Sequence, residues 1–310
     1  MATAIKFESD SLGVILLATD FSETATLALD RAIELAASHG SELALVHVMQ
    51  PDLPPLAAPE MIVVPPNFEE MLKEACNEGL VRAAAFVREA GVAVSMHLEQ
   101  GQPAARITAC ADALSADLIM LGTRGNTGFK RLLLGSVAEE VVRTANQPVL
   151  TVHPGDDRSI EPVRRILLPT DFSKAADQAL SAAMLILVGS EDAEILLVHT
   201  YHIAPTVVPL GGFGNGAPPM LVKNAHQLAE KAAEPSVAAL RERGFQVEVV
   251  VERGDPAEVV TELAADRETD VIVMGTRDHS KWRQFLLGST AERIVEHAPC
   301  PVLTIHRREE

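Results

Sequence analysis

The sequence has few cysteines and aromatic residues, and it lacks long apolar runs. Its 310 residues include three cysteines, one tryptophan, one tyrosine and nine phenylalanines. The cysteines form no CxxC pair, so we expect buried thiols in a reducing compartment rather than a zinc or redox site. No stretch of 18 or more apolar residues occurs, which predicts no membrane span. The N-terminus shows no signal-peptide pattern, and we therefore expect a soluble, cytoplasmic protein.

Positive charge is also scarce, because 26 Lys and Arg face 43 Asp and Glu and leave a net charge of −17. Sequence-independent binding to nucleic acid or to an anionic membrane requires clustered Lys and Arg, so we expect neither partner. The motifs G-x-x-x-x-G-K-[ST], H-E-x-x-H and G-x-S-x-G are absent as well, and no catalytic base is evident. An anionic ligand remains compatible with this charge, because local backbone amides and a few cations can overcome a diffuse acidic field.

The sequence repeats itself once. Residues 15–22 and 166–173 both read Ile-Leu-Leu-x-Thr-Asp-Phe-Ser, and residues 147–153 match residues 300–306 around Pro-Val-Leu-Thr. The offset between matching positions stays between 151 and 153, which indicates a tandem duplication. The polar stretch 154–162 contains Pro and Gly and predicts a linker. We therefore expect domains at residues 1–154 and 163–310.

Each half alternates short apolar runs with segments of helical period. In the first half, the strands are predicted at residues 14–19, 43–48, 92–98, 118–122 and 149–152, and the helices at 22–38, 68–90, 103–114 and 136–145. This alternation indicates βαβ crossovers and a mostly parallel sheet that is covered on both faces. Proline-rich residues 51–66 and 205–219 interrupt the pattern and predict loops.

The most informative segment reads Gly122-Thr-Arg-Gly125, followed by nine residues and then Gly135-Ser136. It begins where an apolar run ends and finishes where a helix is predicted to start. Glycines let backbone amides approach an anion, and a helix start favours negative charge, so this segment predicts a phosphate site. The expected phosphate contacts are the glycines, the first helical turn and nearby cations: Gly122, Gly125, Ser136, Val137, Ala138, Arg124, Lys130 and Arg131.

Thr19 and Asp20 end the first predicted strand, and they flank the same crevice if that strand neighbours the fourth. Asp20 could hydrogen-bond an adenosine or help to hold a divalent ion through water, while His47 and Val48 would offer backbone groups and an apolar edge to a base. Simpler interpretations stay open. Asp20 fits a turn or cap, His47 and the equivalent His199 fit satisfied histidines in apolar strands, and the cations fit a solvated surface.

Together these features resemble the universal stress protein family, in two copies that cover essentially the whole chain. The matching features are Thr-Asp-Phe-Ser, Val-His-Val, the Gly-x-Pro that begins at Gly101, the G-x2-G-x9-G-S spacing and the closing Pro-Val-Leu-Thr-Val. The resemblance implies an α/β fold of two tandem doubly wound domains, each with a five-stranded parallel sheet of order 3-2-1-4-5. It further implies pairing of the two domains through their last strands, and we expect two chains to associate into a homodimer.

The resemblance also implies that ATP or a related adenine nucleotide binds with Mg²⁺. Carried over position by position, the first pocket comprises Ala18, Thr19, Asp20, Val48, Leu121, Gly122, Arg124, Gly125, Gly135, Ser136, Val137 and Ala138. The second half departs from the pattern, because Asp278 stands where the second glycine is expected and Thr200 replaces the valine of strand two. We therefore expect a weaker second site at Thr170, Asp171, Thr200, Gly275, Arg277, Gly288, Ser289 and Thr290.

Three functions are compatible with these features. The leading hypothesis is an ATP-binding regulatory protein of the stress response, whose nucleotide occupancy modulates its conformation or its binding to a protein partner. The alternative is a slow ATP hydrolase or nucleotidyl-transfer enzyme that uses the same crevice, and ATP turnover lost in Asp20→Ala would favour it. The third is an interaction protein with two vestigial pockets, which would show no bound nucleotide and no thermal shift with ATP.

Overall fold

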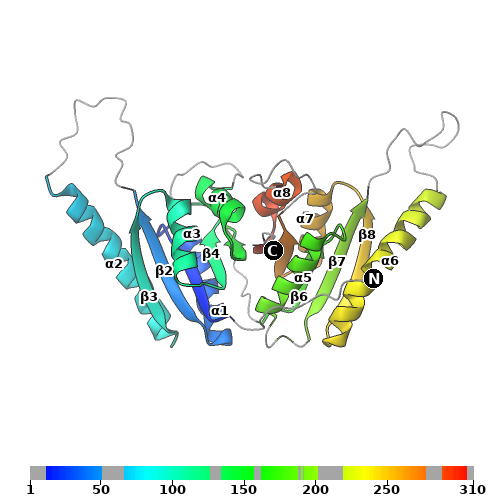
Figure 1. The fold of residues 1–310 in the computed structure, drawn as a ribbon, viewed down its shortest axis with the longest axis horizontal. Helices are drawn as coiled ribbons and strands as arrows, with labels where there is room; N and C mark the ends of the chain where they lie inside the picture. The colour runs from blue at the N-terminus through cyan, green and yellow to red at the C-terminus, as the bar shows by residue number, and fades with distance from the viewer. Residues whose placement is uncertain are drawn as a thin grey trace, which may run out of the picture. The chain divides into compact units, whose positions relative to one another are not determined.

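The structure is a computed structural model that describes residues 12–50, 66–125, 134–156, 162–187, 190, 192–201, 219–276 and 288–305. It contains two compact units, one formed by residues 11–161 and the other containing residues 162–310. We refer to them as the first half and the second half. In each unit, parallel strands alternate with helices (Figure 1), so the α/β class predicted from the sequence is confirmed.

In the first half, the described elements follow the predicted alternation. In chain order they are β1 (Val14–Ala18), α1 (Glu23–His39), β2 (Glu42–Met49), α2 (Phe68–Glu89), β3 (Val94–Gln100), α3 (Pro103–Ala113), β4 (Leu118–Gly122), α4 (Ser136–Thr144) and β5 (Val149–Val152). Neighbouring strands are parallel and run in the order β3-β2-β1-β4-β5. Right-handed crossovers place α1 and α2 on one face of the sheet and α3 and α4 on the other. Helices α3 and α4 contact each other.

The second half repeats this arrangement. Its described elements are β6 (Arg165–Pro169), α5 (Lys174–Ile186), β7 (Glu194–Tyr201), α6 (Pro219–Glu242), β8 (Gln246–Arg253), α7 (Pro256–Asp266), β9 (Val271–Gly275), α8 (Ser289–His297) and β10 (Val302–Ile305). The strands are parallel and run in the order β8-β7-β6-β9-β10. In both halves the strand order therefore reverses between the first and fourth strands, which is where open α/β sheets bind ligands.

Local sequence signals explain where the first helices begin and end. The side chain of Ser22 accepts a hydrogen bond from the amide of Ala25 and caps α1. Gly40 ends that helix with φ of 67°, a left-handed conformation that glycine adopts readily. Most boundaries differ from the prediction by one residue at most, but β3 begins at Val94 rather than at residue 92 and ends at Gln100 rather than at residue 98. The amide of Val92 instead donates to the carbonyl of Val87 and completes the end of α2.

A buried apolar core lies between each sheet and its helices. The central strands are inaccessible on both faces, as expected for parallel strands; Ile15, Leu16 and Leu17 in β1 are at most 1% exposed. All three cysteines are buried free thiols, as the sequence predicted. Within the described part of the chain, no helix combines the length and the apolar character that a membrane crossing needs.

Candidate functional site

The turn after β1 fixes the carboxylate of Asp20. Its Oδ1 atom accepts a hydrogen bond of 3.0 Å from the amide of Ser22, and Thr19 Oγ1 accepts one of 3.1 Å from the amide of Phe21. Phe21 has φ of 62°, which is an uncommon conformation for a bulky residue. Asp20 therefore stabilises the turn through its Oδ1 atom, as the turn interpretation predicts.

The other oxygen of Asp20 faces the glycine loop. A Cβ atom on Gly125 would lie 2.5 Å from Asp20 Oδ2, which is much shorter than an ordinary contact of 3.4–4 Å. Ser22 Oγ also donates to the carbonyl of Arg124 over 3.4 Å. The structure therefore brings the turn after β1 and the segment after β4 close together.

Gly122 allows a second close approach, at the end of β4. A Cβ atom here would lie 2.8 Å from the Thr24 side chain and 3.0 Å from its backbone carbonyl carbon. Because backbone at the start of α1 cannot move aside as a side-chain tip can, glycine is required for this packing. The same spacing that predicts a phosphate site thus also serves the packing of β4 against α1.

The first turn of α4 presents backbone amides. Its N-cap residue is Gly135, with φ of −63° and ψ of 139°, and a glycine has no side chain that could cap the amides of Ser136, Val137 and Ala138. The amide of Gly135 itself donates to the Thr123 carbonyl over 2.8 Å, which ties the helix start to the loop after β4. Uncapped amides and the helix dipole favour an anion at this position.

His47, in β2, positions the β1 turn. Its Nδ1 atom donates to the carbonyl of Thr19 over 2.7 Å, and its ring stacks on Phe21 with centroids 4.6 Å apart. The Phe21 ring in turn lies against α2, where a Cβ atom on Gly79 would be only 2.6 Å from the ring. His47 therefore fits the satisfied-histidine interpretation. The sequence analysis missed this Phe21–Gly79 contact, because nothing in a single sequence pairs these two positions.

The remaining predicted residues lie at the ends of the central strands or outside the described residues. Ala18 and Leu121 are buried at the ends of β1 and β4, and Val48 is half-buried in β2. The predicted cations Lys130 and Arg131, together with Arg277, Lys281 and Asp278 of the second half, lie outside the described residues.

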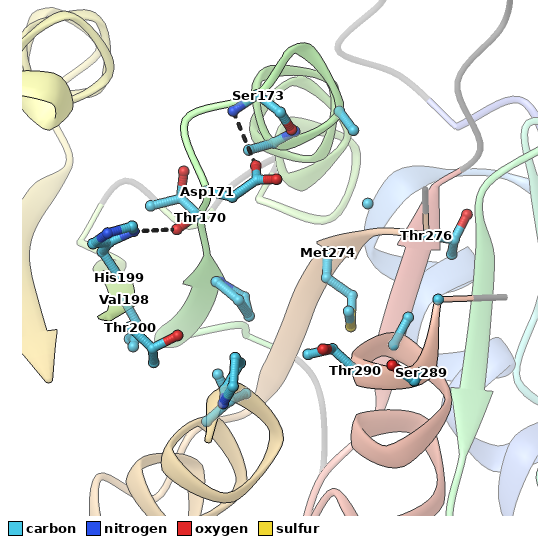
Figure 2. Close-up of a pocket in the computed structure, with 18 residues that line it drawn as sticks. Thr170, Asp171, Ser173, Val198, His199, Thr200, Met274, Thr276, Ser289 and Thr290 are labelled. Carbon is cyan, nitrogen blue, oxygen red and sulfur yellow. Dashed lines mark hydrogen bonds between the residues drawn. The ribbon is translucent and has the colours of Figure 1, made fainter. Parts of the chain in front are cut away.

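The second half reproduces the β1 turn closely. Asp171 Oδ1 accepts from the amide of Ser173 over 2.9 Å, and His199 Nδ1 donates to the Thr170 carbonyl over 2.8 Å (Figure 2). Phe172 has φ of 60° and its ring packs against that of His199 in a tilted arrangement, with centroids 4.6 Å apart and an interplanar angle of 34°. The geometry that positions the first carboxylate has therefore been retained in the duplicate.

A cavity of about 290 Å³ opens beside this second turn. Apolar walls come from Pro169, Val198, Val260 and Met274. Every predicted second-site residue that the structure describes lines it: Thr170, Asp171, Thr200, Gly275, Gly288, Ser289 and Thr290. Figure 2 shows Thr200 on one side of the cavity and Ser289 with Thr290, at the start of α8, on the other.

The second half also carries an additional carboxylate near this turn. Burial raises the pKa of the Asp177 carboxyl above its ordinary value, and the negative charge of Asp171 raises it further. In the first half the equivalent position, 151 residues earlier, is Thr26, whose hydroxyl donates to the carbonyl of Ser22. The sequence offsets this carboxylate, because Lys174 begins α5 at the position where α1 has Glu23.

Known proteins of one family match the chain along most of its length. The model of the universal stress protein family matches residues 12–153 and again residues 162–306. A universal stress protein of Mycolicibacterium smegmatis is 27% identical over 299 residues, which cover 95% of this chain and 97% of that protein. A second one, from Methanocaldococcus jannaschii, is 36% identical over 142 residues, or 44% of this chain and 80% of that protein.

The crystal structure of a universal stress protein from Archaeoglobus fulgidus superimposes with a TM-score of 0.70. The match covers 97% of this chain and 100% of that one at 24% sequence identity, so it supports the tandem fold alone.

Proposed function

The chain belongs to the universal stress protein family, and from this premise we propose that it is a regulatory protein that binds an adenine nucleotide. ATP is held mainly by the first half, and its occupancy modulates the conformation of the chain or its binding to a protein partner. The observation that carries the proposal is the contact between Gly125 and Asp20, where a Cβ atom would approach Oδ2 to 2.5 Å.

This contact supports a phosphate cradle, because the backbone of Gly125 approaches the carboxylate so closely that a Cβ atom there would have to displace it. The uncapped amides at the start of α4 lie at the end of the same loop and supply donors for the phosphates. On this proposal, Asp20 Oδ2 faces the nucleoside or a hydrated Mg²⁺. In the described part of the chain, no group of three His, Cys, Asp or Glu side chains could hold a metal. Mg²⁺ is commonly bound through one or two carboxylates, phosphates and water, and Asp20 is the carboxylate that would help to hold it here.

The preference for the first half follows from the residue that replaces Gly125 in the second. The Asp171 carboxylate is held as that of Asp20 is, by the amide of Ser173. In the sequence, Asp278 takes the position of Gly125, so the glycine motif of this half carries a second carboxylate. Two adjacent carboxylates repel each other and the terminal phosphates of ATP, so we expect the triphosphate to be disfavoured there.

A regulatory role is supported by what the Asp20 turn touches. Asp20 accepts a hydrogen bond from the amide of Ser22, which caps α1, and the neighbouring Phe21 ring contacts α2 at Gly79. A ligand that contacts this turn therefore acts on segments that hold two helices. Small shifts at such a packed contact can bias the arrangement of the elements it joins.

Titration calorimetry with ATP and Mg²⁺ on a matched pair of variants tests the proposal. Asp20→Ala and Asp171→Ala remove the same turn hydrogen bond in the two halves, so they carry similar structural costs. We expect Asp20→Ala to weaken ATP binding about tenfold or more, and Asp171→Ala to leave it close to that of the unmodified chain. No ATP binding by the unmodified chain, or equal losses in both variants, would contradict the proposal.

A further inference from the structure

Arg31, in the middle of α1, is a buried charged residue that the packing of this helix on its sheet does not require. Only 6% of it is exposed, although arginine is rarely buried unless its charge is paired. At the offset of 151 that aligns the two halves here, Ala182 of α5 takes the same position and is also buried. The burial of a guanidinium in the first half therefore has a local reason, because desolvating a charge is unfavourable.

The hydrogen bonds of Arg31 identify this reason. Its Nη1 atom donates to Glu34 Oε1 over 3.0 Å, and its Nη2 atom donates to the backbone carbonyl of Asp156 over 3.2 Å. The Nε atom is buried and has no hydrogen-bond partner among the described residues. Glu34 is one turn further along the same helix and is partly exposed, so that pair alone does not require burial. The contact that requires it is the one with Asp156.

Asp156 belongs to the segment through which the chain leaves the first half, residues 153–156, which we call the exit segment. Gly155 has φ of 78°, a left-handed conformation that suits glycine, and the amide of Asp156 donates to the carbonyl of His153 over 3.4 Å. These two features form a turn directly after β5. His153 and Asp156 are both buried. Arg31 therefore attaches a packed turn at the junction of the two halves to α1.

Helix α1 also begins at the proposed nucleotide site. Ser22 caps the helix and donates its own amide to Asp20 Oδ1. Arg31 follows on the same helix about 14 Å further along, at 1.5 Å per residue. The helix is continuous from Glu23 to His39 and contains no proline or glycine, the residues at which helices usually bend. A displacement of the Asp20 turn therefore reaches Arg31 through one rigid element.

We propose that Arg31 is a positioning residue that attaches the exit segment to α1, so that a ligand at the Asp20 turn acts on the segment that joins the two halves. The inference rests on the proposed function in that ATP is this ligand. It specifies how nucleotide occupancy changes the conformation of the chain, from the Asp20 turn through α1 and Arg31 to the exit segment.

Hydrogen exchange of the full chain, measured by mass spectrometry on peptides that contain residues 153–156, tests the proposal. Arg31→Met keeps an unbranched side chain of similar length but removes all the donors. Without ligand, we expect exchange in the exit segment to become about tenfold faster or more, because its contact with α1 is lost. ATP with Mg²⁺ should slow this exchange in the unmodified chain and have no effect on it in Arg31→Met. The ATP affinity of Arg31→Met, measured by calorimetry, should stay within about threefold of the unmodified value.

Two further variants control for effects on folding. Arg82→Met removes an arginine of α2 that also pairs with a glutamate of its own helix, Glu78, but is exposed, and it should leave the exit segment unchanged. Gly155→Ala keeps Arg31 and disfavours the left-handed turn, and its added Cβ would meet nothing within 4 Å. It should therefore release the exit segment as Arg31→Met does.

The outcomes separate this inference from the proposed function. If exchange without ligand is the same in Arg31→Met as in the unmodified chain, Arg31 does not attach the exit segment and the inference is refuted. If ATP still slows exchange there in Arg31→Met, the path through Arg31 is refuted while the ATP site stands. If the unmodified chain binds no ATP, the proposed function fails and so does the role of the ligand, whereas the exchange without ligand still shows whether Arg31 holds the segment.

Discussion

Replacing Gly125 by alanine tests the close approach on which the first site depends. The added methyl group would lie 2.5 Å from Asp20 Oδ2, so the carboxylate must rotate away and lose its hydrogen bond to the amide of Ser22. Because only a side-chain end has to move, we expect a loss of stability of about 1 kcal/mol, the value of one hydrogen bond. The displaced carboxylate and the wider loop should weaken ATP binding by about ten- to a hundredfold.

Gly125→Asp should have a larger effect, because it adds charge repulsion to the lost amide contacts. A cost of roughly 2–4 kcal/mol corresponds to a loss of about thirty- to a thousandfold in ATP affinity. The reverse change, Asp278→Gly, should permit ATP in the second half.

Urea unfolding and ATP calorimetry measure both effects in a double-mutant cycle with Asp20→Ala. Without the Asp20 carboxylate, the methyl group of Gly125→Ala has nothing to displace, and its stability cost should fall to near zero. Gly288→Ala serves as a control, because its Cβ would lie 3.6 Å from the Thr276 carbonyl, an ordinary contact. The reasoning is refuted if Gly125→Ala leaves stability and ATP affinity unchanged, or if its cost is the same in both backgrounds.

Three further predictions concern packing and ionisation. Gly122→Ala should destabilise the first half by about 1–3 kcal/mol in urea unfolding, more than Gly125→Ala does, because its methyl group meets backbone. The hydrogen bond from Arg293 lowers the pKa of Asp255, so this pair stabilises the fold at neutral pH, and the contribution is lost as the pH falls below about 4. In Arg293→Gln, the melting temperature should therefore fall less steeply as the pH is lowered through this range. Burial raises the thiol pKa of Cys76 and Cys110, so both should resist iodoacetamide at neutral pH until the chain unfolds, as mass spectrometry would show.

Much of the fold could be predicted because its signals are local. Apolar runs mark the buried parallel strands, and Ser22, Gly40 and Pro103 mark helix ends through capping and backbone preferences that act within a few residues. The proximity of the turn after β1 to the segment after β4 could be predicted as well, since it requires only that β1 and β4 are neighbours. Pairing of the halves through residues 149–152 and 302–305 stays a prediction.

The details that decide ligand preference could not be predicted, because they depend on packing between distant segments. The approach of Gly125 to Asp20 and of Phe21 to Gly79 appears only once the chain has folded. The apolar walls of the second-half cavity, such as Val260 in α7 and Met274 in β9, were not predicted, since the motif covers one loop and the cavity is lined by residues from several elements.

Native mass spectrometry of the unmodified chain with ATP and Mg²⁺ tests the central claim most directly, because it counts the nucleotides bound to each chain. The account predicts one tightly bound ATP per chain, absent from Gly125→Asp and retained in Asp171→Ala. Two equivalent ATP molecules per chain, or one that persists in Gly125→Asp, would contradict it.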